Sequence, residues 1–233
     1  MLDEITRIRT EVKFAVDDLQ AEHLAEELGA FLTPVRQSWI TTLYLDRPDR
    51  GLSMAVRSSP TINVKVRLRD YADPASLWLE LKRRAGRSSE KVRARLPRRA
   101  LGPFLGGRDV SAALLEARDP RRSAGEILEA WREIRRLIPG AAVPVGAVCF
   151  FRRSLESGDP RVRVTIDRDI SYHRITAVEG NEPLGLPIAR EQGGTMEVKY
   201  GTLSPAWLSG VARRLAPAPS SKFLSLLRHV DQF

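Results

Sequence analysis

One stretch of seven residues, 63–69, alternates apolar and cationic side chains with a period of two. In a β-strand this period places Lys65, Arg67 and Arg69 on one face and the apolar side chains on the other. Successive cations on that face lie about 7 Å apart and repel one another. The charged face therefore favours an anionic partner, and phosphate oxygens are the groups that Lys and Arg bind best.

The same alternation recurs in five other segments of the chain. Each predicts a strand with one apolar face and one face of mostly cationic side chains with a few carboxylates. Like charges side by side on neighbouring strands cost about 0.2–1 kcal/mol per pair. Six strands with such cationic faces are therefore better explained by a polyanion bound between the faces than by faces exposed to solvent. Their polar faces carry Arg9, Glu11 and Lys13; Glu80 and Lys82; Lys91, Arg93 and Arg95; Arg161, Arg163, Thr165 and Asp167; and Glu197 and Lys199.

The net charge of +9 over 233 residues predicts an anionic partner: nucleic acid, a phosphorylated metabolite, polyphosphate or a membrane surface. Lysine is rare, since only six of the 38 basic residues are lysines. Lysine is a compact point charge that grips phosphate, so its placement indicates a binding role. Five of the six fall on the charged strand faces: Lys13, Lys65, Lys82, Lys91 and Lys199.

Cysteine and histidine are scarce. The single cysteine, Cys149, excludes an internal disulfide and fits a reducing compartment. The three histidines lack the spacing of metal ligands. No apolar run reaches the roughly 18 residues of a membrane span and no signal peptide opens the chain, so we expect a soluble, cytoplasmic protein with no membrane span.

Helices are predicted between and around these strands. Asp17 with Gln20, and Ser123 with Glu126, form capping boxes that open two amphipathic helices. We also predict short helices broken at Gly102-Pro103 and Gly106-Gly107, and a helix starting at Ser204-Pro205. A short strand is predicted at Met54 to Val56, and a last helix begins near Ser221.

The expected fold is α+β. A closed antiparallel β-barrel of about eight strands would point the charges into a lumen, with helices packed on its outside. We expect one domain over residues 1–233, with a helical insertion at about 97–140 and C-terminal helices at about 204–232.

In this order and spacing, the motifs resemble the VTC domain of polyphosphate polymerases, in the triphosphate tunnel metalloenzyme (CYTH-like) superfamily. The resemblance covers nearly the whole chain. The CYTH branch typically has an acidic residue at the first position of the first motif. This chain has Arg9 there, which agrees with VTC domains. The motifs are Arg9-x-Glu11-x-Lys13, Lys65-x-Arg67-x-Arg69, Glu80-x-Lys82, Lys91-x-Arg93, Arg161-x-Arg163-x-Thr165-x-Asp167, Glu197-x-Lys199 and Ser221-Lys222-Phe223.

The resemblance implies a phosphotransferase that moves the ATP γ-phosphate to a growing polyphosphate chain with a divalent metal, Mn²⁺ or Mg²⁺. The phosphate-binding residues it implies are Lys13, Arg67, Arg69, Lys82, Lys91, Arg152, Arg163, Lys199 and Lys222. Phe150 would lie near the nucleotide base, and Arg9, Lys65, Arg93 and Arg161 would line the same ligand.

The carboxylates divide into metal ligands and ion-pair partners. Glu197 is the best candidate metal ligand, because a carboxylate among cations favours a hard ion that bridges to phosphates. Glu11 and Glu80 are either further ligands or partners of neighbouring cations, and Asp167 is predicted to form an ion pair.

Two other functions stay open at the sequence level. The same tunnel fold would suit a hydrolase of tripolyphosphate or nucleoside triphosphates, or a non-enzymatic module that binds polyphosphate or another polyanion. Nucleic acid is not expected, because interleaved carboxylates weaken a groove for the phosphate backbone. Aromatic residues, at 6 %, are also too few for a base-stacking platform.

Overall fold

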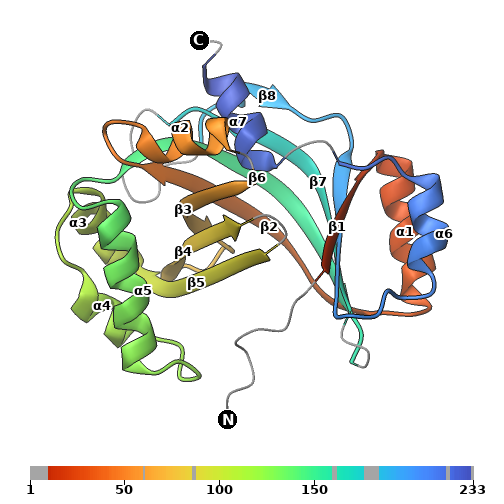
Figure 1. Ribbon diagram of the computed structural model, residues 1–233, viewed down its shortest axis with the longest axis horizontal. Helices are drawn as coiled ribbons and strands as arrows, with labels where there is room; N and C mark the ends of the chain where they lie inside the picture. The colour runs from red at the N-terminus through yellow and green to blue at the C-terminus, as the bar shows by residue number, and fades with distance from the viewer. Residues whose placement is uncertain are drawn as a thin grey trace. The chain divides into compact units, whose positions relative to one another are not determined.

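The computed structural model of the chain describes residues 10–59, 61–85, 88–158, 162–175, 184–218 and 221–231 (Figure 1). In chain order its elements are β1 (Thr10–Val16), α1 (Asp18–Gly29), β2 (Thr33–Asp46), α2 (Gly51–Ser58), β3 (Ile62–Asp70), β4 (Ser76–Ala85), β5 (Ser88–Pro97), a 3-10 helix (Arg98–Ala100), α3 (Leu101–Leu105), α4 (Ser111–Glu116), α5 (Ala124–Leu137), β6 (Val143–Glu156), β7 (Arg163–His173), β8 (Ala189–Arg190), β9 (Gly194–Tyr200), α6 (Leu208–Arg214) and α7 (Lys222–Val230).

The chain forms two compact units. Unit 1 comprises Met1–Trp39, Phe150–Ser171 and Arg190–Ser220, and unit 2 comprises Ile40–Cys149, Tyr172–Ala189 and Ser221–Phe233. Strands β2, β6 and β7 each contribute residues to both units. Each unit is therefore assembled from separate stretches of the chain.

The strands make one large sheet in the order β1-β9-β7-β6-β2-β3-β4-β5, with β8 paired to β7. The ladders of β1 with β9, β9 with β7, and β2 through β5 are antiparallel. The α+β class predicted from the sequence is confirmed. Among the described residues no hydrogen-bonded ladder joins β1 to β5, so the closed barrel stays a prediction.

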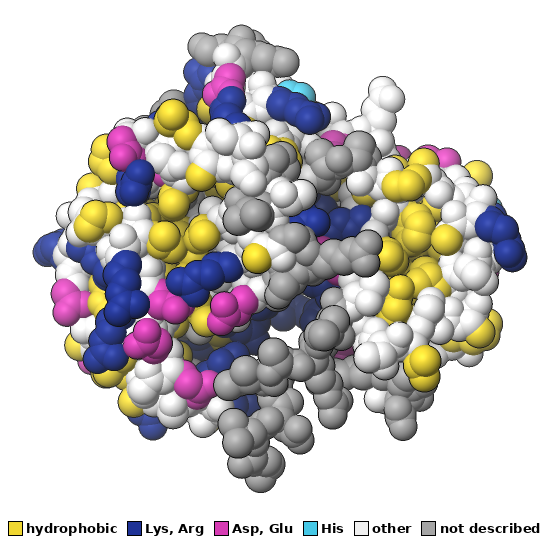
Figure 2. Space-filling model, in the orientation of Figure 1, with side chains coloured by type: hydrophobic (Ala, Val, Ile, Leu, Met, Phe, Trp, Pro, Cys, Tyr) yellow, Lys and Arg dark blue, Asp and Glu magenta, His cyan; other side chains and the backbone are white. Residues whose placement is uncertain are grey.

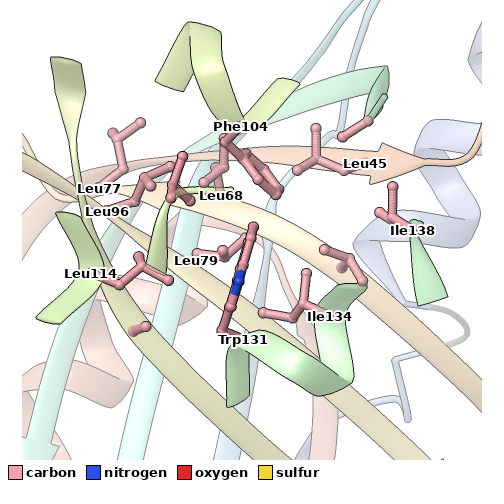
Figure 3. Close-up of a cluster of buried hydrophobic side chains, with 14 of the residues drawn as sticks. Leu45, Leu68, Leu77, Leu79, Leu96, Phe104, Leu114, Trp131, Ile134 and Ile138 are labelled. Atoms are coloured by element: carbon pink, nitrogen blue, oxygen red, sulfur yellow. The ribbon is translucent and has the colours of Figure 1, made fainter. Parts of the chain in front are cut away.

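In unit 2 the apolar faces of β3, β4 and β5 are buried under helices α3, α4 and α5. Leu68, Leu79 and Leu96 from the strands pack with Phe104 from α3 and Trp131 from α5 (Figure 3). The Phe104 and Trp131 rings lie 6.0 Å apart. This core confirms the alternation predicted for the three strands, because it leaves their charged side chains on the opposite face.

Helix α5 begins as the sequence predicts. Ser123 Oγ accepts a hydrogen bond from the Glu126 amide at 3.2 Å, and Glu126 Oε2 accepts one from the Ser123 amide at 2.7 Å. Its outer face carries charges of both signs (Figure 2), among them Arg132 and Glu129, which form an ion pair at 3.4 Å. Helix α5 has three Arg and three Glu, so it does not add to the cationic excess of unit 2.

Unit 1 has a core of its own, between helices α1 and α6 and the apolar faces of β1, β9 and β7. Leu28 of α1 and Val211 of α6 pack in the cluster that holds Val164, Met196 and Val198, and all five are fully buried. The capping box at Asp17 is also present, with the Gln20 amide donating to Asp17 Oδ1 at 2.7 Å. These helices leave the charged faces of the three strands uncovered by the apolar core.

Three local predictions are wrong. The segment predicted as a strand at Met54 to Val56 is helix α2, because the buried Asp46 carboxylate accepts hydrogen bonds from the Leu52 and Ser53 amides at 3.0 and 2.8 Å. Gly102-Pro103 lies inside the first turn of α3, where the missing proline N–H costs nothing. The helix expected from Ser204 begins at Leu208 instead, as α6.

The helices between β5 and β6, from the 3-10 helix to the end of α5, occupy Arg98–Leu137, within the helical segment expected at about 97–140. Ser221 caps α7, the last helix, as expected. None of the helices in the described ranges is both long and apolar enough to cross a membrane.

The unit 2 core makes a quantitative prediction about stability. Leu79 is fully buried between β4 and the helices, so Leu79→Ala should lower the free energy of unfolding by about 2–5 kcal/mol. Leu186, in the same unit, is 92 % exposed, and Leu186→Ala should change it by less than about 0.5 kcal/mol. Urea unfolding followed by circular dichroism measures both, and equal losses would contradict the packing described for Leu79.

Candidate functional site

The strongest concentration of cations in unit 2 lies on the face of β3, β4 and β5 that the helices do not cover. Residues opposite one another in antiparallel register lie about 5 Å apart at Cβ, and alternate residues share a face. The register therefore sorts nine side chains into three rows, which we call the unit 2 grid. The rows are Lys65-Lys82-Lys91, Arg67-Glu80-Arg93 and Arg69-Trp78-Arg95.

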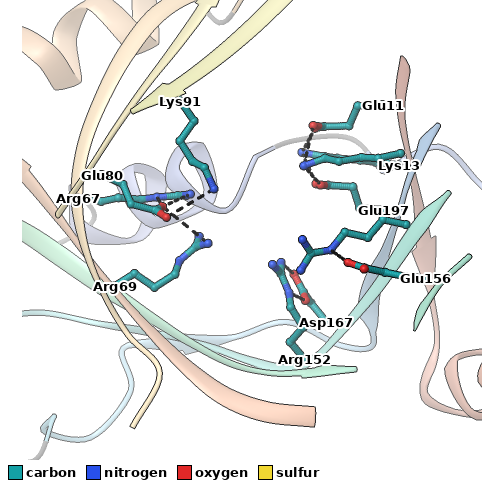
Figure 4. Close-up of polar contacts among 12 residues, drawn as sticks. Glu11, Lys13, Arg67, Arg69, Glu80, Lys91, Arg152, Glu156, Asp167 and Glu197 are labelled. Atoms are coloured by element: carbon teal, nitrogen blue, oxygen red, sulfur yellow. Dashed lines mark hydrogen bonds and ion pairs between the residues drawn. The ribbon is translucent and has the colours of Figure 1, made fainter. Parts of the chain in front are cut away.

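Glu80 stands at the centre of this grid and is its only carboxylate. Its side chain is fully buried, and Oε2 lies 2.7 Å from Arg67 Nη2 and 3.8 Å from Arg69 Nη1 (Figure 4). The Lys91 ammonium is 3.7 Å from the other oxygen, Oε1. Burial alone would raise the pKa of Glu80, but Arg67, Arg69 and Lys91 outweigh it and hold the pKa far below its usual value. Glu80 is therefore ionised throughout the physiological range.

The lysine row places three like charges directly opposite one another. Lys65 donates a hydrogen bond to Ser221 Oγ at 3.2 Å, next to Lys222 at the start of α7. Burial lowers the pKa of Lys91 to about 8; Glu80 opposes this shift, while Arg93, Arg69 and Arg67 add to it. Both burial and the neighbouring arginines disfavour the charged form of Lys91, so an anion bound beside its ammonium group would stabilise that form.

Unit 1 presents a different pattern, in which charges of opposite sign alternate. On β1 and β9, Glu11 lies opposite Lys199 and Lys13 lies opposite Glu197. Four ion pairs link them: Lys13 to Glu11 at 3.0 Å and to Glu197 at 3.2 Å, and Lys199 to Glu11 at 3.3 Å and to Glu197 at 2.7 Å (Figure 4). Burial of Glu197 raises its pKa, but Lys199 and Lys13 outweigh this and lower it well below the usual range. We call these four residues the unit 1 quartet.

Strand β7 extends the charged face beside the quartet. Thr165 lies opposite Glu197, and its buried Oγ1 has no hydrogen-bond partner among the described residues. Arg163 lies opposite Lys199 and pairs with Glu156 at 3.2 Å. On the neighbouring strand β6, Arg152 donates two hydrogen bonds to the Asp167 carboxylate, at 2.6 and 2.7 Å (Figure 4). This contact confirms the ion pair predicted for Asp167.

The quartet suits a hard divalent cation better than a soft one. The described part of the chain contains no group of three or more His, Cys, Asp or Glu side chains placed to hold a metal by themselves. Glu11, Glu197 and Thr165 could supply oxygen ligands, and Mg²⁺-like ions are held by one or two carboxylates with substrate phosphates supplying further oxygens. Glu80 fits less well, because its side chain is fully buried, whereas those of Glu11 and Glu197 are 26 % and 19 % exposed.

The structure gathers the predicted residues into separate groups. Unit 2 brings together Lys65, Arg67, Arg69, Glu80, Lys82, Lys91 and Arg93, with Lys222 on α7 beside Ser221; unit 1 brings together Glu11, Lys13, Glu197 and Lys199, with Arg152 and Arg163 on the adjoining strands. Arg9 and Arg161 lie outside the described residues.

One residue of the grid was missed in the sequence, and one predicted residue is poorly placed. Trp78 precedes Glu80 by two residues and shares its face, so the alternation alone was the signal that could have found it. Phe150, expected beside the nucleotide base, is only 2 % exposed, with the Arg152 guanidinium 5.1 Å from its ring. As it stands, Phe150 offers little surface to a ligand.

Comparison with known proteins gives this arrangement a context. The profile of the VTC domain family matches residues 8–227, which is nearly the whole chain. The chain belongs to the VTC domain family. None of the curated proteins compared with this VTC domain by sequence is significantly similar to it.

Two solved structures share its fold at low sequence identity. HpAC1 from Hippeastrum, named as an adenylyl cyclase and described as having a dominant triphosphatase activity, is 16 % identical with a TM-score of 0.56, over 94 % of each chain. A protein from Bacillus halodurans named as an adenylate cyclase is 11 % identical with a TM-score of 0.51, over 94 % of this chain and 96 % of its own. The VTC domain thus shares its overall fold with these two proteins.

The buried carboxylate of the grid makes a prediction that does not depend on any ligand. Glu80→Gln removes the counter-charge of two arginines that are 12 % and 10 % exposed, so it should lower the free energy of unfolding by about 3–5 kcal/mol. Glu90→Gln on β5 is the matched control, because Glu90 is 66 % exposed and 3.9 Å from Arg83. Urea unfolding at low salt should show almost no change for the control; a Glu80→Gln variant as stable as that control would refute a structural role for the carboxylate.

Proposed function

We propose that this VTC domain is a metal-dependent polyphosphate polymerase that transfers the γ-phosphoryl group of ATP to the end of a polyphosphate chain. The observation that carries the proposal is the lysine row of the unit 2 grid, Lys65-Lys82-Lys91, in a chain of this family. Three ammonium groups in register repel one another unless phosphate oxygens lie between them.

Phosphoryl transfer asks of a protein mainly that it position the reactants and neutralise their charge. The bond from the γ-phosphorus to its bridging oxygen breaks, and the electron pair leaves with ADP. A terminal oxygen of the polyphosphate chain forms the new bond to phosphorus. In this proposal Lys82, Lys91 and Lys65 bind phosphate oxygens, while Glu80 holds Arg67 and Arg69 in place.

The metal would be held by Glu197 and Glu11, with Thr165 beside them. A bound Mn²⁺ or Mg²⁺ would supply charge neutralisation to the phosphate oxygens. Lys13 and Lys199 contact the same carboxylates, so in this proposal they bind phosphate oxygens next to the ion. The closed barrel expected from the sequence belongs to the proposal as well.

A hydrolase is the second candidate, since HpAC1, which shares the fold, is described as a triphosphatase. The same cations stabilise transfer to water or to a phosphate chain, so the charged faces alone do not separate the two. Membership in the VTC family and the basic residue Arg9 in the first motif support the polymerase. A third candidate, a module that binds polyphosphate without chemistry, would share the grid but need no metal.

The decisive assay follows both products of ATP. Purified protein with ATP and Mn²⁺ should release ADP together with a polymer longer than triphosphate, visible on a gel, and a chelator should stop both. Orthophosphate that accumulates in step with ADP, without polymer, would identify a hydrolase. Unchanged ATP with tight binding of polyphosphate would identify the binding module.

Lys91 gives a pH dependence with a definite sign. Its pKa of about 8 means that the side chain is charged below that pH and loses its charge as the pH rises through it. Affinity for tripolyphosphate should therefore be full near pH 7 and fall as the pH rises through about 8, because the cation that binds phosphate disappears.

Lys91→Arg is the control, because arginine stays charged over this range and leaves the titration of the ligand unchanged. The ratio of wild-type to Lys91→Arg affinity, measured by isothermal titration calorimetry, should fall up to about tenfold between pH 7 and pH 9.5. A ratio that does not change with pH would show that Lys91 does not contact the bound phosphate.

A further inference from the structure

The third row of the unit 2 grid differs from the other two, because an aromatic ring stands between its cations. Trp78 lies opposite Arg69 on β3 and opposite Arg95 on β5. It is partly exposed on the same face as Glu80 and Lys82. An aromatic side chain on a charged face is unexpected if the face binds phosphate alone, since indole offers phosphate a single N–H donor.

Arg93 is stacked on this ring. The centre of its guanidinium lies 4.3 Å from the Trp78 ring centroid, whereas that of Arg95 lies at 5.8 Å. A cation–π contact of this length holds the guanidinium over the indole face, and the side of the guanidinium away from the ring is left for a ligand. Trp78 therefore fixes the orientation of Arg93.

The neighbouring arginines of the row are committed elsewhere. Arg95 bonds Asp73 at 2.8 Å and Ser76 at 3.2 Å, and Arg69 bonds the hydroxyl of Tyr71 at 3.3 Å near Glu80. Within the described ranges no ion pair joins Arg93 to a carboxylate. Its charge and its outer face are thus available to a ligand.

We infer that the Trp78–Arg93 stack is the platform for the nucleobase of the phosphoryl donor, an inference that rests on the proposed function. The base would stack on the outer face of the Arg93 guanidinium, as bases do on arginine planes in other nucleotide sites. Trp78 is a positioning residue that holds this plane, and Arg93 is the contact residue. Phe150, the aromatic first expected to take the base, is too deeply buried to do so.

The spacing along β4 agrees with this assignment. Trp78 and Lys82 are four residues apart on one strand, a distance of about 13 Å at the usual rise. A single nucleotide can therefore place its phosphates on the lysine row and its base on the stack. Phosphates alone would use the lysine row and leave the stack empty.

The test compares two ligands that share their phosphates and differ in the base. The non-hydrolysable imido analogues of ATP and of tripolyphosphate are titrated by calorimetry, with Mg²⁺ present, into the wild-type protein, Trp78→Leu and Arg93→Lys. Both variants should bind the ATP analogue about tenfold more weakly, the loss expected for one base stack. Both should bind the tripolyphosphate analogue within about twofold of the wild type, because Arg93→Lys keeps the charge and loses only the plane.

Two further variants keep the result interpretable. Trp78→Phe retains a ring and should restore most of the ATP affinity, which a fold defect in Trp78→Leu would not predict. Trp39→Leu removes an exposed tryptophan of unit 1, next to Phe151, and should leave both affinities unchanged. ATP analogue should also quench the fluorescence of the wild type more than that of Trp78→Phe.

Equal losses for both ligands would make Arg93 a phosphate ligand and overturn the inference. Unchanged affinities in Trp78→Leu and Arg93→Lys would also overturn it, because the stack would then be purely structural. Failure of the proposed function looks different: the variants would lose affinity for the ATP analogue alone, as expected for the stack, but ATP with Mn²⁺ would give no polymer.

Discussion

The unit 2 grid depends on the ion pairs of one buried carboxylate. The grid holds seven cations, three from β3, one from β4 and three from β5, and Glu80 is the single acidic residue among them. A buried charge is tolerated only with partners at bonding distance, and Glu80 has Arg67 at 2.7 Å. Glu80 offsets only part of the charge of its own row, and the lysine row has no carboxylate, so surplus positive charge remains on the grid for an anion.

The charged strand faces of the two units differ in their balance of charge. In the unit 1 quartet two carboxylates and two ammonium groups alternate, so the face is locally neutral and each charge has two partners of opposite sign. In the unit 2 grid seven cations share one carboxylate, so the face carries a net positive charge. The first arrangement suits a cation that needs oxygen ligands, and the second suits an anion.

The sequence predicted these faces well because strand alternation is a local property. Val66, Leu68, Leu79 and Leu81 are buried where a period of two requires it, and their charged neighbours lie on the other face. What the sequence could not predict is which charges meet, because the register of the strands decides that Glu80 lies opposite Arg67 rather than Lys65. The burial of Phe150 could not be predicted for a related reason, since it depends on neighbours that alternation does not reveal. Helix α2 was missed because the carboxylate that caps it belongs to Asp46, at the end of β2.

The pairing of β1 with β9 has a consequence for how the chain acquires its structure during synthesis. Val12 pairs with Val198 and Phe14 with Met196. Strand β9 therefore emerges from the ribosome only after the whole of the chain between it and β1 has been made. Until then the nascent β1 carries unpaired backbone groups and an apolar face without a cover, features that favour aggregation. Pairing over such a separation also makes folding slow, because the entropy cost of closing a long loop precedes the stabilisation that the strand contacts provide. Unit 1 therefore has to mature late, while the hairpins of β3, β4 and β5 can form as soon as they are made.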